Sequence, residues 1–154
     1  DSSNDAIYVI DPDSTYIIEC NQPGYNSLGY QRNEVVNCLK IADINPQMAR
    51  KGAWCAFLNE LKAAKSMLFE HNNIHKNGSE IPVEVSISYV QFDRESYILA
   101  VVRDISQRKA AEKLIWQQAN FDHLTGLPNR RLLTDRLQQS INSVDPNDNN
   151  ITLL

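Results

Sequence analysis

The sequence lacks the features that would place it directly in a membrane, in a nucleic-acid complex or in the secretory pathway. No apolar run approaches the ~20 residues that a helix needs to span a bilayer, so we expect no membrane contact from this chain. The net charge of -4 leaves no basic stripe, which disfavours direct binding to nucleic acid. The chain opens with D-S-S-N-D instead of a basic and then apolar stretch, so no signal peptide is expected.

Cysteine is scarce as well. The three cysteines, Cys20, Cys38 and Cys55, are odd in number and far apart. Reduced thiols in a cytoplasmic protein fit this usage better than a disulfide framework or a zinc site. We therefore expect a cytoplasmic chain, with any membrane tether of a parent protein lying outside it.

The usual arrangements of catalytic groups are missing too. With only five glycines, the sequence shows no phosphate-binding glycine loop, and it shows no nucleophile–base pair and no cluster of metal ligands. We predict no catalytic residue and no metal site in this chain. Its 154 residues suffice for one domain with a proper core, or for one domain and part of another.

The first part of the chain predicts a β-hairpin followed by a helix. Ala6 to Ile10 is a short, β-prone apolar run, and strand character resumes from Tyr16 to Cys20 after the turn signal D-P-D-S. Asn21 precedes Pro23, which is the pattern of an N-cap with proline in the first helical turn.

Helical patterns occupy the next thirty residues or so. Glu34 to Pro46 predicts short helices that end at an Ile-Asn-Pro break. Lys51 to Lys65 predicts a longer helix, in which Trp54, Leu58 and Leu61 share one face.

Three more strands complete the pattern. Met67 to Lys76 and Glu80 to Tyr89 predict strands joined through Asn77-Gly78, where both residues tolerate the positive φ of a tight hairpin turn. In the second of these strands every other residue is apolar, which indicates one buried face. After a turn from Phe92 to Ser96, a last strand runs from Tyr97 to Arg103. The whole predicts an α+β fold: a five-stranded antiparallel sheet with helices on one face.

A stretch without glycine or proline, from Asp104 through Thr125, then predicts a long connector helix. Asp104 and Ser106 can accept hydrogen bonds from its first N–H groups. Alternating steps of three and four give one seam of a heptad pattern, made of Ala111, Leu114, Gln118 and Phe121. Spacing alone leaves two alternatives open, a seam that pairs with a second copy or a helix packed on its own domain.

A helix breaker follows, from Gly126 to Asn129. Arg130 to Ile141 predicts a second, short amphipathic helix. Beyond it we expect a polar loop from Ser143 to Asn150 and the start of an apolar strand from Ile151 to Leu154.

Two motifs carry a resemblance to known families. The run D-x-L-T-G-L-P-N-R-R, from Asp122 to Arg131, resembles the opening of a GGDEF-type diguanylate cyclase domain. The preceding V-V-R-D-I-S-Q-R-K-A-A-E resembles the closing strand and exit helix of a PAS (PAS/PAC) sensor domain. The resemblance divides the chain into a PAS domain (1–105), a connector helix (106–121) and the N-terminal fragment of a GGDEF domain (122–154).

The resemblance implies a bacterial signalling protein that makes cyclic di-GMP from two molecules of GTP with Mg²⁺. The metal-binding acidic residues and the GGDEF signature of that family are absent here, so we expect no enzyme activity from this chain. The opening-motif residues Asp122, Thr125, Asn129 and Arg130 are then structural, with Asp122 and Arg130 holding the turn through hydrogen bonds and charge pairing. Cyclases of this type act as dimers, so the expected partner is a second copy.

Two alternatives remain open. The chain could be a PAS dimerisation module whose pocket is collapsed and holds no ligand. The downstream domain could also be a degenerate cyclase that acts only as a receptor, or be followed by a phosphodiesterase (EAL) domain.

The candidate pocket residues are Trp54, Phe69 and His71, and a small organic molecule is the expected ligand. Flavin is disfavoured, because Asn37-Cys38 is not followed by the rest of the photoreceptor signature, and we expect Cys38 to be a buried structural thiol. His71 and His75 are four apart on a predicted strand and would share a face, but haem is disfavoured because the long helix has no histidine. Asp104, Ser106 and Leu114 are the candidate residues for coupling the pocket to the connector.

Overall fold

The computed structural model describes residues 5–143 of the chain. The chain divides into two compact units, one that ends at Gln107 and one that begins at Arg108. The first unit contains the sheet, and the second contains two helical segments joined by a turn.

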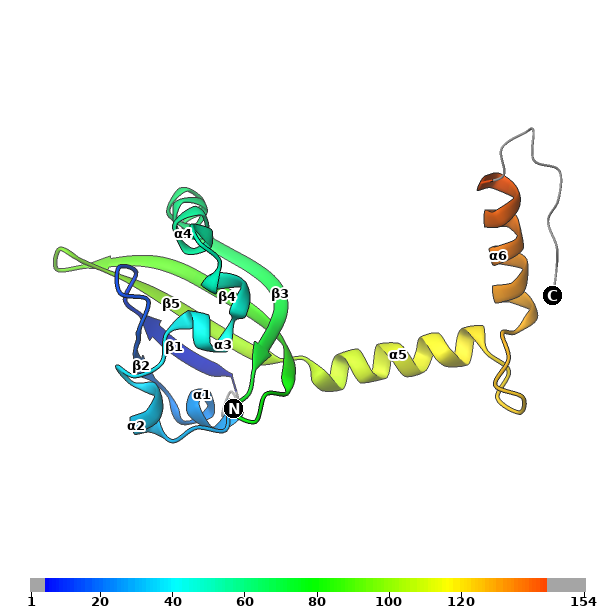
Figure 1. Cartoon of the computed structure of the whole chain (residues 1–154), viewed down its shortest axis with the longest axis horizontal. Coiled ribbons are helices and arrows are strands. Elements are labelled where there is room, and N and C mark those ends of the chain that lie inside the picture. Colours follow the sequence, from blue (N-terminus) through cyan, green and yellow to red (C-terminus); the bar gives the residue numbers. More distant parts are fainter. Residues whose placement is uncertain (1–4, 144–154) are drawn as a thin grey trace. The chain divides into compact units, whose positions relative to one another are not determined.

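The first unit is built on a five-stranded antiparallel sheet with the order β2-β1-β5-β4-β3, in which the last strand lies beside the first (Figure 1). The strands are β1 (Ala6–Ile10), β2 (Ile17–Cys20), β3 (Ser66–Ile74), β4 (Glu80–Phe92) and β5 (Glu95–Asp104). Five strands were predicted, with the helices inserted between the second and the third, and the structure confirms both.

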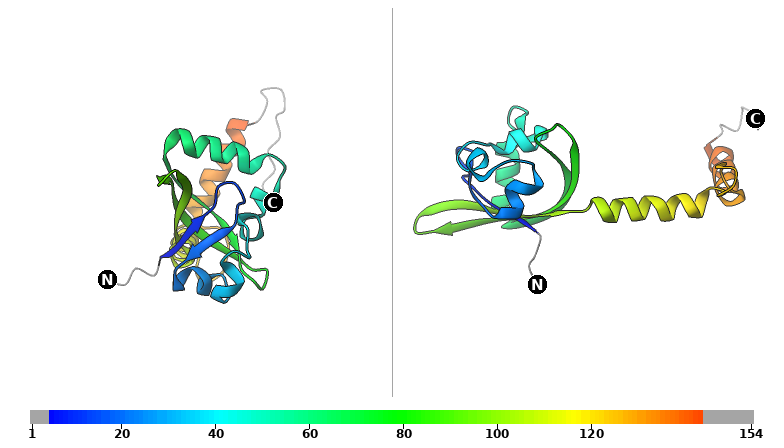
Figure 2. Two further views of the ribbon diagram at one scale, coloured as in Figure 1. Left: turned by 90° about the vertical axis from the view of Figure 1, so that its left-hand side faces the viewer. Right: turned by 90° about the horizontal axis from the view of Figure 1, so that it is seen from below.

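The helices between β2 and β3 lie on one face of this sheet (Figure 2). They are α1 (Gln22–Ser27), α2 (Arg32–Val35), α3 (Ile41–Ile44), the 3-10 helix η1 (Pro46–Ala49) and α4 (Ala53–Ala64). The core fills the space between helices and sheet: β4 contributes alternate residues, Val83, Val85 and Ile87, and α4 contributes the fully buried Leu61. This alternation confirms the single buried face predicted for that strand.

Helix α1 begins where the sequence predicted. The Asn21 side chain accepts a hydrogen bond from the N–H of Gly24 at 2.9 Å, and it also accepts one from Ile7 in β1. Gly24 is buried, and its carbonyl accepts the hydroxyl of Tyr8 at 2.7 Å. A Cβ at position 24 would lie 3.2 Å from the Tyr8 ring, so the glycine permits this close approach of helix and strand.

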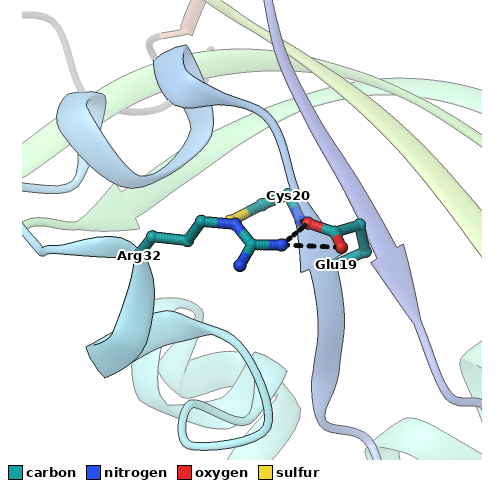
Figure 3. Close-up of polar contacts among 3 residues, drawn as sticks. All are labelled: Glu19, Cys20 and Arg32. Atoms are coloured by element: carbon teal, nitrogen blue, oxygen red, sulfur yellow. Dashed lines mark hydrogen bonds and ion pairs between the residues drawn. The ribbon is translucent and has the colours of Figure 1, made fainter.

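Helix α2 is tied to β2 by an ion pair. The guanidinium of Arg32 donates to both carboxylate oxygens of Glu19, at 2.7 and 2.8 Å, and the two side chains flank Cys20 (Figure 3). The pair lowers the pKa of Glu19. Both side chains are more than half exposed, so solvent screens the attraction between them and the pair mainly orients α2.

The two hairpin turns differ from their predicted form. In the β3–β4 turn only Gly78 has a positive φ, 86°, and its N–H donates to His75 O at 2.8 Å, so Asn77 is not left-handed as expected. The β4–β5 turn is tighter than the five residues predicted: Asp93 and Arg94 alone connect the strands, with φ of 46° and 72°. Two left-handed residues match the twist of adjacent strands, a preference that overrides the usual demand for glycine.

The connector helix α5 (Ser106–Asn120) is shorter than the glycine- and proline-free stretch allowed. The prediction that Phe121 belongs to the helical seam is wrong: Phe121 lies beyond the helix and packs against Trp116, with ring centroids 5.6 Å apart. A tertiary contact stops the helix, because Asn129 donates through Nδ2 to the Ala119 carbonyl at 2.8 Å.

The same asparagine begins the next helix, α6 (Arg130–Ser143), by accepting the N–H of Leu132 at 3.0 Å. Within the turn, Asp122 accepts hydrogen bonds from the N–H and the hydroxyl of Thr125, both at 2.9 Å. These bonds match the hydrogen bonding expected of Asp122, whereas neither Asp122 nor Arg130 forms an ion pair among the described residues, so the charge pairing expected of them stays a prediction. The side chain of Ile141, the predicted loop after Ser143 and the predicted strand 151–154 lie outside the described part of the chain.

Candidate functional site

A cavity of about 50 Å³ lies between the sheet and the helices of the first unit. Its lining comes from β1, β3, β4 and β5 on the sheet side, and from α3, η1 and α4 on the helix side. The wall is almost entirely apolar and includes the three residues predicted from the sequence, Trp54, Phe69 and His71. Their role in ligand binding stays a prediction.

These three side chains form one aromatic row together with Phe57. The ring centroids of neighbours are 5.8 Å apart for Trp54–Phe57, 6.0 Å for Phe57–Phe69 and 5.6 Å for Phe69–His71. Trp54 is fixed at the other end, where its indole N–H donates to the Pro12 carbonyl at 2.8 Å. The row therefore joins α4, β3 and the β1–β2 turn along one wall of the cavity.

Two titratable side chains line the cavity, Tyr8 and His71, and His71 belongs to the aromatic row. Its Nε2 is 2.8 Å from Oδ1 of Asn73, two residues further along the same face of β3. With that oxygen accepting, the ring proton sits on Nε2, and Nδ1 carries a lone pair. Nδ1 is buried and has no hydrogen-bond partner. Burial lowers the pKa of His71 below its ordinary value of 6.5, so the ring is neutral at pH 7.

Sequence reasoning missed two polar residues of the wall, Asn45 and Asn73, which are 8% and 4% exposed. The sequence contains a pattern that could have indicated each of them. Asn73 continues the period-two pattern of Phe69 and His71 on β3, and Asn45 lies in the Ile-Asn-Pro break, where its Oδ1 accepts the N–H of Gln47 at 3.1 Å.

A family model described as "PAS domain" matches residues 4–107, which is more than half of the chain. The chain belongs to the PAS domain family. The cavity described above lies entirely within the matched residues.

Curated relatives support the assignment. A methyl sulfide methyltransferase-associated sensor from Methanosarcina acetivorans is 32% identical over 130 residues, which are 82% of this chain and 12% of that protein. An uncharacterized signaling protein from Caulobacter vibrioides is 35% identical over 81 residues, 50% of this chain and 10% of its own length. The chain thus spans only about a tenth of either relative.

Solved structures show the same fold. The PAS domain of an HTR-like protein from Haloarcula marismortui is 30% identical, with a TM-score of 0.59 over 68% of this chain and 84% of that one. A PAS domain from Colwellia psychrerythraea is 20% identical, with a TM-score of 0.60 over 70% and 92% of the two chains. At its lower identity the second structure speaks for the fold alone.

Two cofactor-related predictions need correction. His75 does not share a strand face with His71, because β3 ends at Ile74 and the His75 ring lies against Gly29 at the end of α1. Cys38 is exposed rather than buried, and it does not line the PAS cavity. Within residues 5–143 no group of three metal-ligating side chains occurs, and no helix is long and apolar enough to cross a bilayer.

The last strand of the PAS domain leads from the cavity into the connector helix. Ala100 and Val102 on β5 line the cavity, and Asp104 ends the strand. As predicted, the Asp104 carboxylate accepts a hydrogen bond at the start of α5, from the N–H of Ser106 at 2.7 Å. Ile105, between Asp104 and Ser106, is 3% exposed, and its N–H donates to the Pro82 carbonyl in β4 at 3.0 Å.

The neutral state of His71 predicts a pH dependence of stability. The unfolded chain binds a proton near pH 6.5, whereas the folded PAS domain binds it only at lower pH, so the free energy of unfolding should fall as the pH drops below 6.5. We expect the melting temperature of wild type to drop more steeply than that of His71→Gln between about pH 7 and pH 5. Equal slopes for wild type and His71→Gln would show that His71 titrates normally.

Proposed function

We propose that this PAS domain is the sensory module of a bacterial signalling protein whose C-terminal domain is a diguanylate cyclase. The observation that carries the proposal is the continuity of β5, which contributes Ala100 and Val102 to the cavity wall and two residues later provides the cap of α5. A change in the cavity therefore reaches the connector helix through one short piece of backbone.

The cyclase assignment is supported by the motif from Asp122 to Arg131. Its turn is held by side chains that belong to the motif, namely Asp122, Thr125 and Asn129. The parent protein would use GTP and Mg²⁺ to make cyclic di-GMP, and the chain itself would be regulatory, not enzymatic. The sensor named among its relatives is consistent with this role.

The proposed partner is a second copy of the chain. Leu114 and Ile115 on α5 are 55% and 65% exposed, and adjacent exposed apolar side chains of this kind can mark an interaction surface. Together with Ala111 and Gln118 they form one face of the helix, which we call the connector seam. Pairing of two seams would set how the two cyclase domains face each other, and the state of the cavity would bias that pairing.

One observation favours a second candidate function. A cavity of about 50 Å³ is far smaller than the 300 Å³ or more of typical ligand sites, which fits a PAS domain that only dimerises. The two functions differ in whether molecules that enter the cavity change the output.

Filling the cavity separates these candidates. Ala100→Leu adds three carbon atoms to a wall residue that is 4% exposed, and it should block entry of any ligand. We expect cyclic di-GMP output of the wild-type parent protein to change when a small-molecule cell extract is added, and that of Ala100→Leu to stay constant. Ala56→Leu, on the exposed side of α4, is the control and should respond as wild type does. A response retained by Ala100→Leu would contradict sensing through this cavity, and no response in wild type would favour the dimerisation module.

A further inference from the structure

Three oxygen atoms of the cavity wall form hydrogen bonds within the protein. Tyr8 donates its hydroxyl to Gly24 O, Asn45 accepts the N–H of Gln47, and Asn73 accepts from His71. Among the side chains described, those of residues 5–140, Nδ1 of His71 is the one fully buried nitrogen or oxygen without a partner. A buried acceptor without a donor is costly, so this atom is an open position for hydrogen bonding.

The wall also excludes charge. None of its fifteen residues is an aspartate, glutamate, lysine or arginine. A carboxylate, phosphate or ammonium group would have to leave water without a counter-charge, which is strongly unfavourable. The chemistry of the wall therefore selects against ionic ligands.

Size restricts the choice further. An apolar cavity of about 150 Å³ is known to hold benzene, and this cavity has about a third of that volume. Without movement of the wall, it has room for only a few non-hydrogen atoms.

We propose that the cavity takes a compact, uncharged molecule with a small apolar body and one hydrogen-bond donor, which binds to Nδ1 of His71. The apolar part would contact the aromatic row from Trp54 to Phe69, and the donor would meet the one unpartnered acceptor of the wall. This inference rests on the sensory function proposed above and specifies the chemical class of its signal.

Two probes with the same carbon–oxygen skeleton test the proposal. Propan-2-ol has an O–H donor, whereas acetone only accepts, so the pair isolates the donated bond. Titrations of the wild-type chain would be followed by NMR through the methyl groups of Val85 and Ile87 in the wall, and through the imidazole nitrogens of all three histidines. We expect propan-2-ol to bind at least about fivefold more tightly than acetone and to shift Nδ1 of His71 while leaving His75 and His123 unchanged.

A variant gives the complementary result. His71→Phe keeps a ring beside Phe69 but removes Nδ1, so the preference for propan-2-ol should disappear. His123→Phe, in the second unit, should keep it. The imidazole spectrum of the wild-type chain tests the same point without any substitution, in case His71→Phe fails to fold.

The outcomes separate the two proposals. Equal binding of both probes in wild type, or a His71 that carries its proton on Nδ1, would overturn the donor assignment and leave binding in the cavity intact. If neither probe shifts the wall methyl groups, the cavity admits at most water, and the proposed sensing through it fails as well.

Discussion

Leu114→Asp is expected to convert a dimer of this chain into a monomer while the PAS domain stays folded. The substitution places a carboxylate in the connector seam of each copy, and an unpaired polar group buried at such a place costs about 1–3 kcal/mol. Because each dimer would bury two such carboxylates, the substitution should weaken association roughly 30-fold or more. The lost burial of the leucine side chains would add to this effect. Native mass spectrometry at micromolar concentration would measure the change.

The seam is short, which makes the effect easy to detect. It spans little more than two turns of α5, contains Gln118, and lacks Phe121, which packs outside the helix. A marginal dimer of this kind has little free energy to lose. In the parent protein the same substitution should lower cyclic di-GMP output about tenfold or more, because two cyclase domains must meet.

Lys113→Asp is the matched control. Lys113 is exposed, and it lies about 100° around the helix from Leu114, on the side away from Ile115. Lys113→Asp introduces the same carboxylate as Leu114→Asp and changes the net charge by one unit more. A dimer that survives Lys113→Asp but not Leu114→Asp therefore depends on the seam. A dimer that survives both assembles through the PAS domain, and a parent chain that is monomeric would contradict the seam altogether.

The features that were predicted correctly from the sequence are those that local physical chemistry decides. Period-two alternation located β4, the Asn21-x-Pro23 pattern located the start of α1, and the short polar Asp104 located the cap of α5. In each case the residues that encode the element are also the ones that make its hydrogen bonds or its buried face.

The predictions were wrong where residues distant in sequence, or the pairing of strands, determine the structure. The end of α5 depends on Asn129, nine residues beyond it, and composition allowed the helix to continue to Thr125. The tight β4–β5 turn depends on strand twist, which outweighs the poor fit of Arg94 to a left-handed backbone. Both are cases of structural context overriding local preference.

The candidate site was only partly accessible to sequence reasoning. The strand period and the helix face placed Trp54, Phe69 and His71 on the wall of the cavity, but the size of the cavity and the partner of each polar atom follow from three-dimensional packing. The unpartnered Nδ1 of His71 is such a feature, since it depends on which ring nitrogen meets Asn73.

The second large effect is expected at the junction of strand and connector. Asp104→Ala removes the carboxylate that accepts the N–H of Ser106, and loss of a helix cap typically costs about 0.5–2 kcal/mol. That is enough to shift a balanced equilibrium between two connector states about 2- to 30-fold, but not enough to unfold a domain. Asp104→Asn keeps an oxygen at the same position, and asparagine caps helices as well as aspartate does, so it should behave like wild type.

The central claim, that the PAS domain acts on a downstream cyclase through this junction, is tested most directly by cyclic di-GMP production of the full-length parent protein carrying Asp104→Ala. We predict that the variant folds, melts no more than about 15 °C below wild type and binds the cavity probes as wild type does, while its output, or the response of that output to cell extract, changes several-fold. Output and response identical to those of wild type and Asp104→Asn would contradict the claim and show that coupling does not pass through this cap.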